Sequence, residues 1–127
     1  MGYYSDVGLA LTKTGVDLLQ TKLASSEVSE ELKKEVKSLL AEADKHYTDT
    51  ASGAEVWYWD CIKWYDSKPD GFPDVCFIMD VLTELEETEY RFIRIGEEYD
   101  DTEVKGFFWE NPFDFELSRG ITLADCA

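Results

Sequence analysis

Between Ile95 and Glu116 the chain reads IGEEYDDTEVKGFFWENPFDFE, which holds eight carboxylates and one lysine among several aromatic residues. Carboxylates in this number could serve as general acids, as ligands of a divalent cation, or as an anionic surface for a basic protein. The aromatic residues favour the last use, because rings of this kind supply much of the contact area in protein interfaces. The partner-binding residues predicted on this basis are Glu97, Glu98, Asp100, Asp101, Glu103, Trp109, Glu110, Asp114 and Glu116.

Motifs for nucleophilic or phosphate chemistry are missing from the sequence. It contains no G-x-S-x-G, no G-x-x-x-x-G-K-[ST] and no G-x-G-x-x-G. The one histidine, His46, is expected at the C-terminal end of a helix, where a cationic side chain is favourable. We expect the protein not to be an enzyme. An acid pair for glycoside hydrolysis stays an alternative, because two carboxylates can meet from distant parts of a chain.

Spacing argues against the common metal sites. The segment DSKPDGFPDVCF begins like a calcium loop, with Asp66 and Asp70 at positions one and five. However, Lys68 and Phe77 stand at positions three and twelve, where the loop needs ligands. Zinc sites need paired Cys or His at short spacing, and no Cys-x-x-Cys occurs. We therefore expect no metal and no cofactor, with a weak divalent site among the acids of 97–103 as an alternative.

The net charge excludes some classes of partner. The chain has 28 acids against 12 Lys and Arg, which gives −16, and residues 65–127 carry 17 acids and 5 bases, or −12. Binding to DNA, RNA or anionic lipid needs Lys and Arg at the contact surface. We therefore expect a basic protein as partner, with no direct nucleic-acid contact and no membrane.

The sequence also favours a cytoplasmic protein. Its opening residues, MGYYSD, lack the basic and apolar regions of a signal peptide. No apolar run approaches the roughly 20 residues that span a bilayer. The three cysteines are an odd number without framework spacing, which indicates reduced thiols.

Hydrophobic periodicity predicts one α+β domain over residues 1–127. The expected elements are a strand at 4–12, helices after Thr14 and over 29–45, two strands around Ser52-Gly53, a helix from Pro73, a strand at 89–96 and short strands near 105–109 and 113–117. We expect an antiparallel sheet with helices on one face, a ferredoxin-like β-α-β-β-α-β core plus a C-terminal β extension.

Three local features of this prediction are specific enough to be tested. Thr14 and Asp17 are expected to form a capping box. The helix over 29–45 is expected to bury one apolar stripe and to leave a mixed-charge face in solvent. In the strand VWYWDCI, we expect one face of rings to pack in the core; if Val56, Tyr58 and Ile62 point inward, Trp57 and Trp59 face outward or lie under the C-terminal extension.

The segments MGYYSDVGLA, CIKWYD and FIRIGEEYDD resemble a loose group of short acidic proteins encoded by bacteriophages and prophages. The resemblance is spread over most of the chain through short motifs and brings no catalytic residues with it. It implies a phage accessory protein in the bacterial cytoplasm. Such a protein would inhibit a host nuclease, restriction enzyme or CRISPR effector by imitating DNA.

The charge of the chain is large enough for such imitation. A compact chain of this length has a diameter of about 36 Å, and duplex DNA of that length carries about 21 phosphates. A net charge of −16 is comparable. The alternatives are an immunity protein or antitoxin that caps a basic toxin, an enzyme or metal module, and acids that serve solubility alone.

Overall fold

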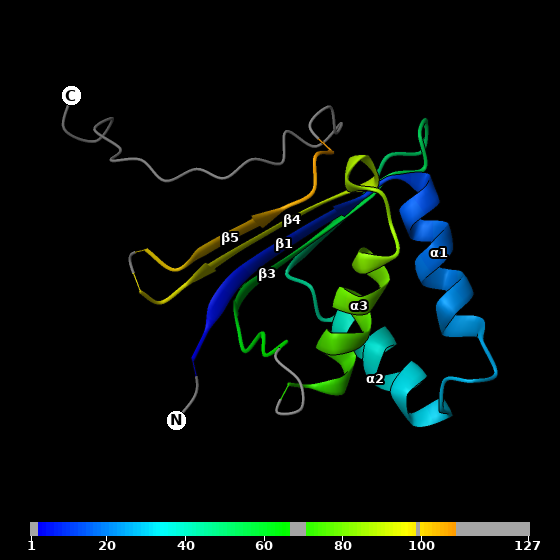
Figure 1. The fold of residues 1–127 in the computed structure, drawn as a ribbon, viewed down its shortest axis with the longest axis horizontal. Helices are drawn as coiled ribbons and strands as arrows, with labels where there is room; N and C mark the ends of the chain where they lie inside the picture. Colours follow the sequence, from blue (N-terminus) through cyan, green and yellow to red (C-terminus); the bar gives the residue numbers. More distant parts are fainter. Residues whose placement is uncertain (1–2, 67–70, 99, 109–127) are drawn as a thin grey trace.

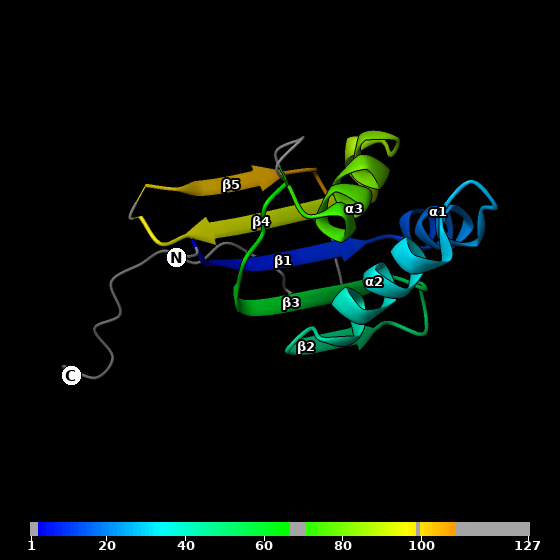
Figure 2. The same cartoon turned by 90° about the horizontal axis from the view of Figure 1, so that it is seen from below.

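The computed structural model describes residues 3–66, 71–98 and 100–108. The elements in this part of the chain are β1 (Ser5–Leu11), α1 (Lys13–Ala24), α2 (Glu30–Ala41), β2 (Lys45–Thr48), β3 (Glu55–Ile62), α3 (Pro73–Thr83), the 3₁₀ turn η1 (Glu87–Glu89), β4 (Tyr90–Gly96) and β5 (Thr102–Lys105). The strands form one antiparallel sheet in the order β2-β3-β1-β4-β5. The helices lie on one face of this sheet (Figures 1 and 2). The predicted α+β class and layer arrangement are therefore confirmed.

The architecture is consistent with a ferredoxin-like core but departs from the simple β-α-β-β-α-β pattern. Two helices, α1 and α2, connect β1 to β2, and β5 adds a strand beside β4. Figure 1 shows the β4–β5 hairpin extending beyond the helices, at the left of the view. The turn of this hairpin therefore lies away from the helical layer.

β1 occupies the centre of the sheet, and its face toward the helices is wholly apolar from Val7 to Leu11. Val7, Leu9 and Leu11 alternate on the face toward the helices and are at most 1% exposed. Ala10, which points to the other face, is also fully buried. Such a strand is stable only between two neighbours, and β1 pairs with both β3 and β4.

Both N-terminal helices begin at hydroxyl caps. Thr12 caps α1, since its Oγ1 accepts a hydrogen bond from the Gly15 amide at 3.3 Å. The predicted capping box at Thr14 and Asp17 is therefore wrong, and Asp17 pairs with Lys13 instead, at 2.8 Å. α2 begins after Ser29 and turns the predicted apolar stripe to the core, with Val36 and Leu39 buried and Leu32 and Leu40 partly buried; Ala43, the last residue of the stripe, packs on the core just beyond the helix end.

The tryptophans of β3 face the helices and lie in the core, which is the reverse of the orientation in which Val56 points inward. Trp57 and Trp59 are 3% and 1% exposed, and Trp59 Nε1 donates a hydrogen bond to the carbonyl of Leu39 on α2 at 2.9 Å. Val56 is buried as well, although it points to the opposite face. Since Val56 and Tyr58 make the second face of the strand partly apolar, alternation alone did not show which face meets the helices.

His46 lies in β2, so the predicted position at a helix end is wrong. α2 stops at Ala41, and the chain then turns into a strand that pairs with β3. The imidazole stacks on Trp57, with ring centroids 4.9 Å apart, and its Nε2 lies 2.7 Å from Glu55 Oε1. The histidine thus covers the edge of the aromatic core.

α3 closes the core over the sheet and packs against α1 and α2. It begins at Pro73, as predicted, and its buried residues include Ile78 and Leu82. The chain leading into it carries Trp64, whose ring centroid lies 5.2 Å from that of Trp59. The core is therefore rich in large rings.

β5 begins at Thr102, several residues before the strand predicted near 105–109. Its position is set by pairing with β4, where Glu103 lies opposite Arg94. The strand ends before Gly106, which has φ 85° and no room for a Cβ beside the Tyr90 carbonyl. The strand predicted near 113–117 lies outside the described residues.

Candidate functional site

The acids predicted for recognition on the β4–β5 hairpin are partly bound within the chain. Arg94 on β4 donates from Nη2 to Asp101 Oδ1 at 2.7 Å and from Nε to Glu103 Oε1 at 3.1 Å. Lys105 lies 3.0 Å from the other oxygen of Glu103. The charges of Asp101 and Glu103 are thus balanced by neighbouring cations.

The pKa shifts agree with this geometry. Hydrogen bonds from Arg94, and then from the Tyr3 hydroxyl, lower the pKa of Asp101 to about 2. Burial alone would raise the pKa of Glu103, but hydrogen bonds from Lys105 and Arg94 lower it overall. Both acids therefore stay charged and paired at neutral pH, which is a structural role.

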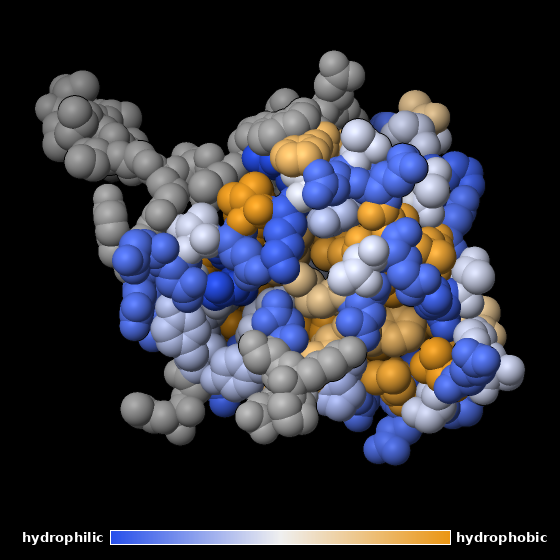
Figure 3. Space-filling model, viewed as in Figure 1, coloured by the Kyte–Doolittle hydropathy of each residue, from blue (hydrophilic) through white to orange (hydrophobic). Residues whose placement is uncertain are grey.

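The structure describes three further predicted acids at the end of the hairpin, Glu97, Glu98 and Asp100. Glu97 accepts a hydrogen bond from the backbone amide of Tyr4. Glu98 and Asp100 are exposed. Figure 3 shows mainly hydrophilic residues at the left of the view, where the β4–β5 hairpin ends in Figure 1. The other predicted residues, Trp109, Glu110, Asp114 and Glu116, lie outside the described residues.

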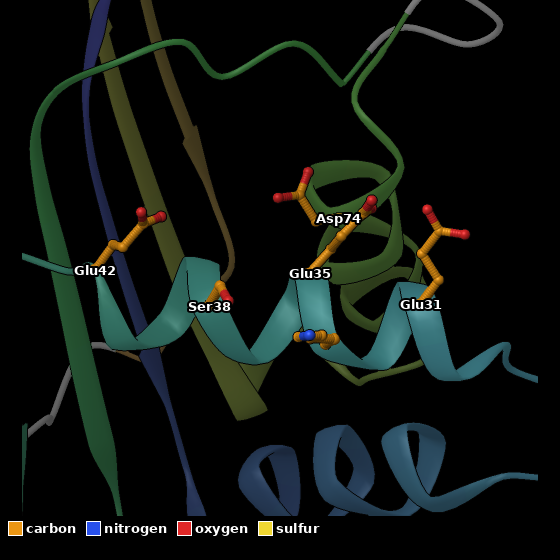
Figure 4. A pocket seen from close by; sticks show the side chains of 6 residues that line it. Glu31, Glu35, Ser38, Glu42 and Asp74 are labelled. Atoms are coloured by element: carbon orange, nitrogen blue, oxygen red, sulfur yellow. The ribbon is translucent and has the colours of Figure 1, made fainter.

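A larger group of carboxylates surrounds a hollow between α2 and the first turn of α3. The hollow has a volume of about 480 Å³ and is lined by Glu31, Lys34, Glu35, Ser38, Glu42 and Asp74. Figure 4 shows the three glutamates extending from one side of α2, with Asp74 beside Glu35. We call these four carboxylates the α2–α3 acid group. The lining also contains Lys34, so the four carboxylates exceed the positive charge around the hollow.

None of these four carboxylates is among the partner-binding residues predicted from the sequence. Glu31, Glu35 and Glu42 are separated by four and seven residues, a spacing that places them on one side of a helix. This spacing could have been recognised in the sequence. The mixed charges of the segment are, however, also typical of a helix face that is simply exposed to solvent. The contribution of Asp74 depends on how α3 packs against α2, which no local pattern specifies.

A third gathering of carboxylates holds the irregular pairing at the end of β3. Cys61, with φ 59°, donates its amide hydrogen to Asp6 Oδ1 at 3.0 Å, and the Asp60 amide donates to Asp44 Oδ2 at 2.7 Å. A side-chain hydrogen bond with Asp6 raises the pKa of Asp60. Asp6 and Asp44 thus stabilise the backbone at the end of β3 by accepting these hydrogen bonds.

The described residues hold no group of three or more His, Cys, Asp or Glu side chains arranged to bind a metal ion. Nor does any helix within the described ranges have the length and apolarity needed to span a bilayer. No protein-family model, curated protein or solved structure matches this chain.

Proposed function

We propose that this chain is a non-enzymatic acidic inhibitor, which binds the nucleic-acid groove of a basic protein in place of DNA. The observation that supports this most directly is the α2–α3 acid group. Its four carboxylates converge from two helices on one hollow with one lysine in the lining. Carboxylates that are gathered in this way attract cationic side chains and speed association with a basic partner.

The spacing of these carboxylates suits a surface that normally binds phosphates. Along the axis of α2, Glu31 and Glu35 are separated by about 6 Å, and Glu35 and Glu42 by about 10 Å, since the rise is about 1.5 Å per residue. One strand of duplex DNA carries a phosphate about every 3.4 Å. The two separations therefore approach two and three phosphate steps.

The class of partner follows from charge and from the resemblance described above. A protein that binds duplex DNA must present Lys and Arg, and those side chains are complementary to this chain. The resemblance to short phage-encoded acidic proteins favours a host nuclease, restriction enzyme or CRISPR effector, met in the bacterial cytoplasm. A basic toxin would use the same contacts and is distinguished by the identity of the bound protein.

Two variants of equal charge test the proposal. The first neutralises the α2–α3 acid group with Glu31→Gln, Glu35→Gln, Glu42→Gln and Asp74→Asn. The control neutralises four acids that already pair within the chain, with Asp17→Asn, Glu30→Gln, Glu55→Gln and Glu84→Gln. Both variants lose four negative charges. A difference in binding between them therefore depends on where the removed charges lie and not on the net charge.

The measurement is capture of bacterial proteins by each immobilised variant at low and high salt, followed by competition with duplex DNA. We expect the unaltered chain and the control to capture a DNA-binding protein that duplex DNA displaces. The α2–α3 variant should lose most of this capture. Equal loss in both variants, or a captured protein that DNA does not displace, would contradict the proposal.

A further inference from the structure

Tyr3 joins the turn of the β4–β5 hairpin to two distant segments. Its hydroxyl donates a hydrogen bond to Asp101 Oδ2 at 2.6 Å and accepts one from the Glu98 amide at 3.1 Å. Its own amide donates to the Tyr65 hydroxyl, on the chain between β3 and α3, at 2.7 Å. One residue near the N-terminus therefore contacts both sides of the hairpin turn and anchors it to the body of the protein.

Arg94, on β4, completes this network. Its Nη1 donates to Asp101 Oδ2 and to Ser5 Oγ, both at 3.1 Å, while Nη2 donates to Asp101 Oδ1. The Asp101 carboxylate thus bonds to Tyr3 and Arg94 at once. Gly96 leaves the space for this arrangement, because a Cβ there would collide with the Asp101 carboxylate and the Tyr3 hydroxyl.

We infer that Tyr3 is a positioning residue, which ties Glu98 to Asp101 at the end of the β4–β5 hairpin and so presents Glu98 and Asp100 to arginine or lysine side chains of a partner. This inference rests on the proposed function and adds a second contact element to it. A turn that is ordered before binding loses less conformational entropy on association. The turn projects beyond the helices, where a partner can reach it (Figure 1).

The first test measures the turn without any partner. Tyr3→Phe keeps the ring and the net charge but removes the hydroxyl that bonds Asp101 and Glu98. Amide hydrogen exchange at Glu98 and Asp101 should become about tenfold faster, as expected when a hydrogen bond to a charged group is lost. Exchange in β1 should stay unchanged. Unchanged exchange at the turn would overturn the inference.

Two further variants serve as controls for this measurement. Tyr47→Phe is the matched control, because Tyr47 is 56% exposed on the far edge strand β2 and should leave exchange in the hairpin unchanged. Gly96→Ala should accelerate exchange at the turn in the same way as Tyr3→Phe, since the added methyl group displaces the same contacts. If Gly96→Ala left the turn protected, the network would not be what orders it.

The second test separates positioning from general stability, with a nona-arginine peptide as the probe. Tyr3→Phe should weaken binding of the peptide several-fold in the unaltered background. It should have no further effect when Glu98→Gln and Asp100→Asn are already present, because the contacts that Tyr3 positions are then gone. Equal weakening in both backgrounds would show a merely structural role and overturn the inference.

The two proposals fail in different ways. If the chain captures no DNA-binding protein while Tyr3→Phe loosens the turn and weakens peptide binding only when the two acids are present, the proposed function fails and the positioning role of Tyr3 stands. If capture and DNA competition succeed but exchange at Glu98 and Asp101 is unaffected by Tyr3→Phe, only the inference about Tyr3 fails.

Discussion

Asp101 and Asp60 are both carboxylates near the ends of strands, yet their surroundings shift their pKa in opposite directions. Asp101 bonds to Arg94 and Tyr3, which favour its charged form. Asp60 shares a hydrogen bond with Asp6, which favours its protonated form. A pKa difference between the folded and unfolded states is also a difference in stability. The two residues should therefore contribute to stability in different pH ranges.

Asp101→Asn should lower the melting temperature at pH 7. The folded pKa of about 2 lies below the ordinary value of about 3.9. The stabilisation is therefore complete above about pH 4 and is lost as the pH falls towards 2. The difference between the variant and the unaltered chain should shrink over that interval in thermal unfolding. Asp100→Asn, one residue earlier and exposed, is the control and should change little.

Asp60→Asn should behave in the opposite way. Because the folded pKa is raised, the favourable contribution of the protonated carboxyl group exists at low pH and is lost as the pH rises through that pKa. At pH 7 the neutral amide should therefore raise the melting temperature, by an amount that disappears near pH 4. A variant that is less stable than the unaltered chain at pH 7 would show that Asp6 and Asp60 do not repel each other.

At the scale of elements, the strands and helices with one dominant pattern were predictable. β1 and α3 follow from apolar alternation and from Pro73 before an apolar stripe, and the apolar stripe of α2 is confirmed. The errors fall where two patterns compete. Each of the two threonines, Thr12 and Thr14, is followed at close spacing by residues that suit a helix start, so the sequence did not distinguish them. In the structure it is Thr12 that caps α1.

The site was less predictable than the fold, because its acids differ through contacts made far away in sequence. Asp101 and Asp100 are adjacent, but only Asp101 meets Arg94 and Tyr3, and Tyr3 is 98 residues distant. In the same way, Asp74 joins the glutamates of α2 only through helix packing. A sequence pattern gives the number of carboxylates, whereas the fold decides which are neutralised.

The hydrogen bond from Trp59 Nε1 on β3 to the carbonyl of Leu39 joins the sheet to α2. Trp59→Phe removes this bond and part of a fully buried ring, so we expect a loss of about 2–4 kcal/mol in the free energy of unfolding. Urea unfolding at neutral pH measures it. Trp64→Phe is a matched control, because Trp64 is 4% exposed and its Nε1 has no hydrogen-bond partner within the described part of the chain. Equal losses in the two variants would show that the bond to Leu39 contributes nothing.

For the whole molecule, unbalanced charge opposes the same fold that these contacts stabilise. Several lysines pair with acids, as Lys22 does with Glu84, but exposed pairs contribute little to stability. A net charge of −16 leaves many like charges within a Debye length of about 10 Å at 0.1 M salt. Conformational stability should consequently depend on ionic strength, and most strongly where unpaired acids converge.

The melting temperature should rise as sodium chloride increases from about 10 to 200 mM, since screening weakens this repulsion. The variant that neutralises the α2–α3 acid group has a net charge of −16 + 4 = −12. Its melting temperature at low salt should be higher than that of the unaltered chain and should depend less on salt.

The control with four paired acids neutralised has the same net charge but loses attractive contacts, so its melting temperature at low salt should lie below that of the first variant. Identical curves for the two would mean that only net charge matters, and a flat curve for the unaltered chain would mean that its acids are already well separated.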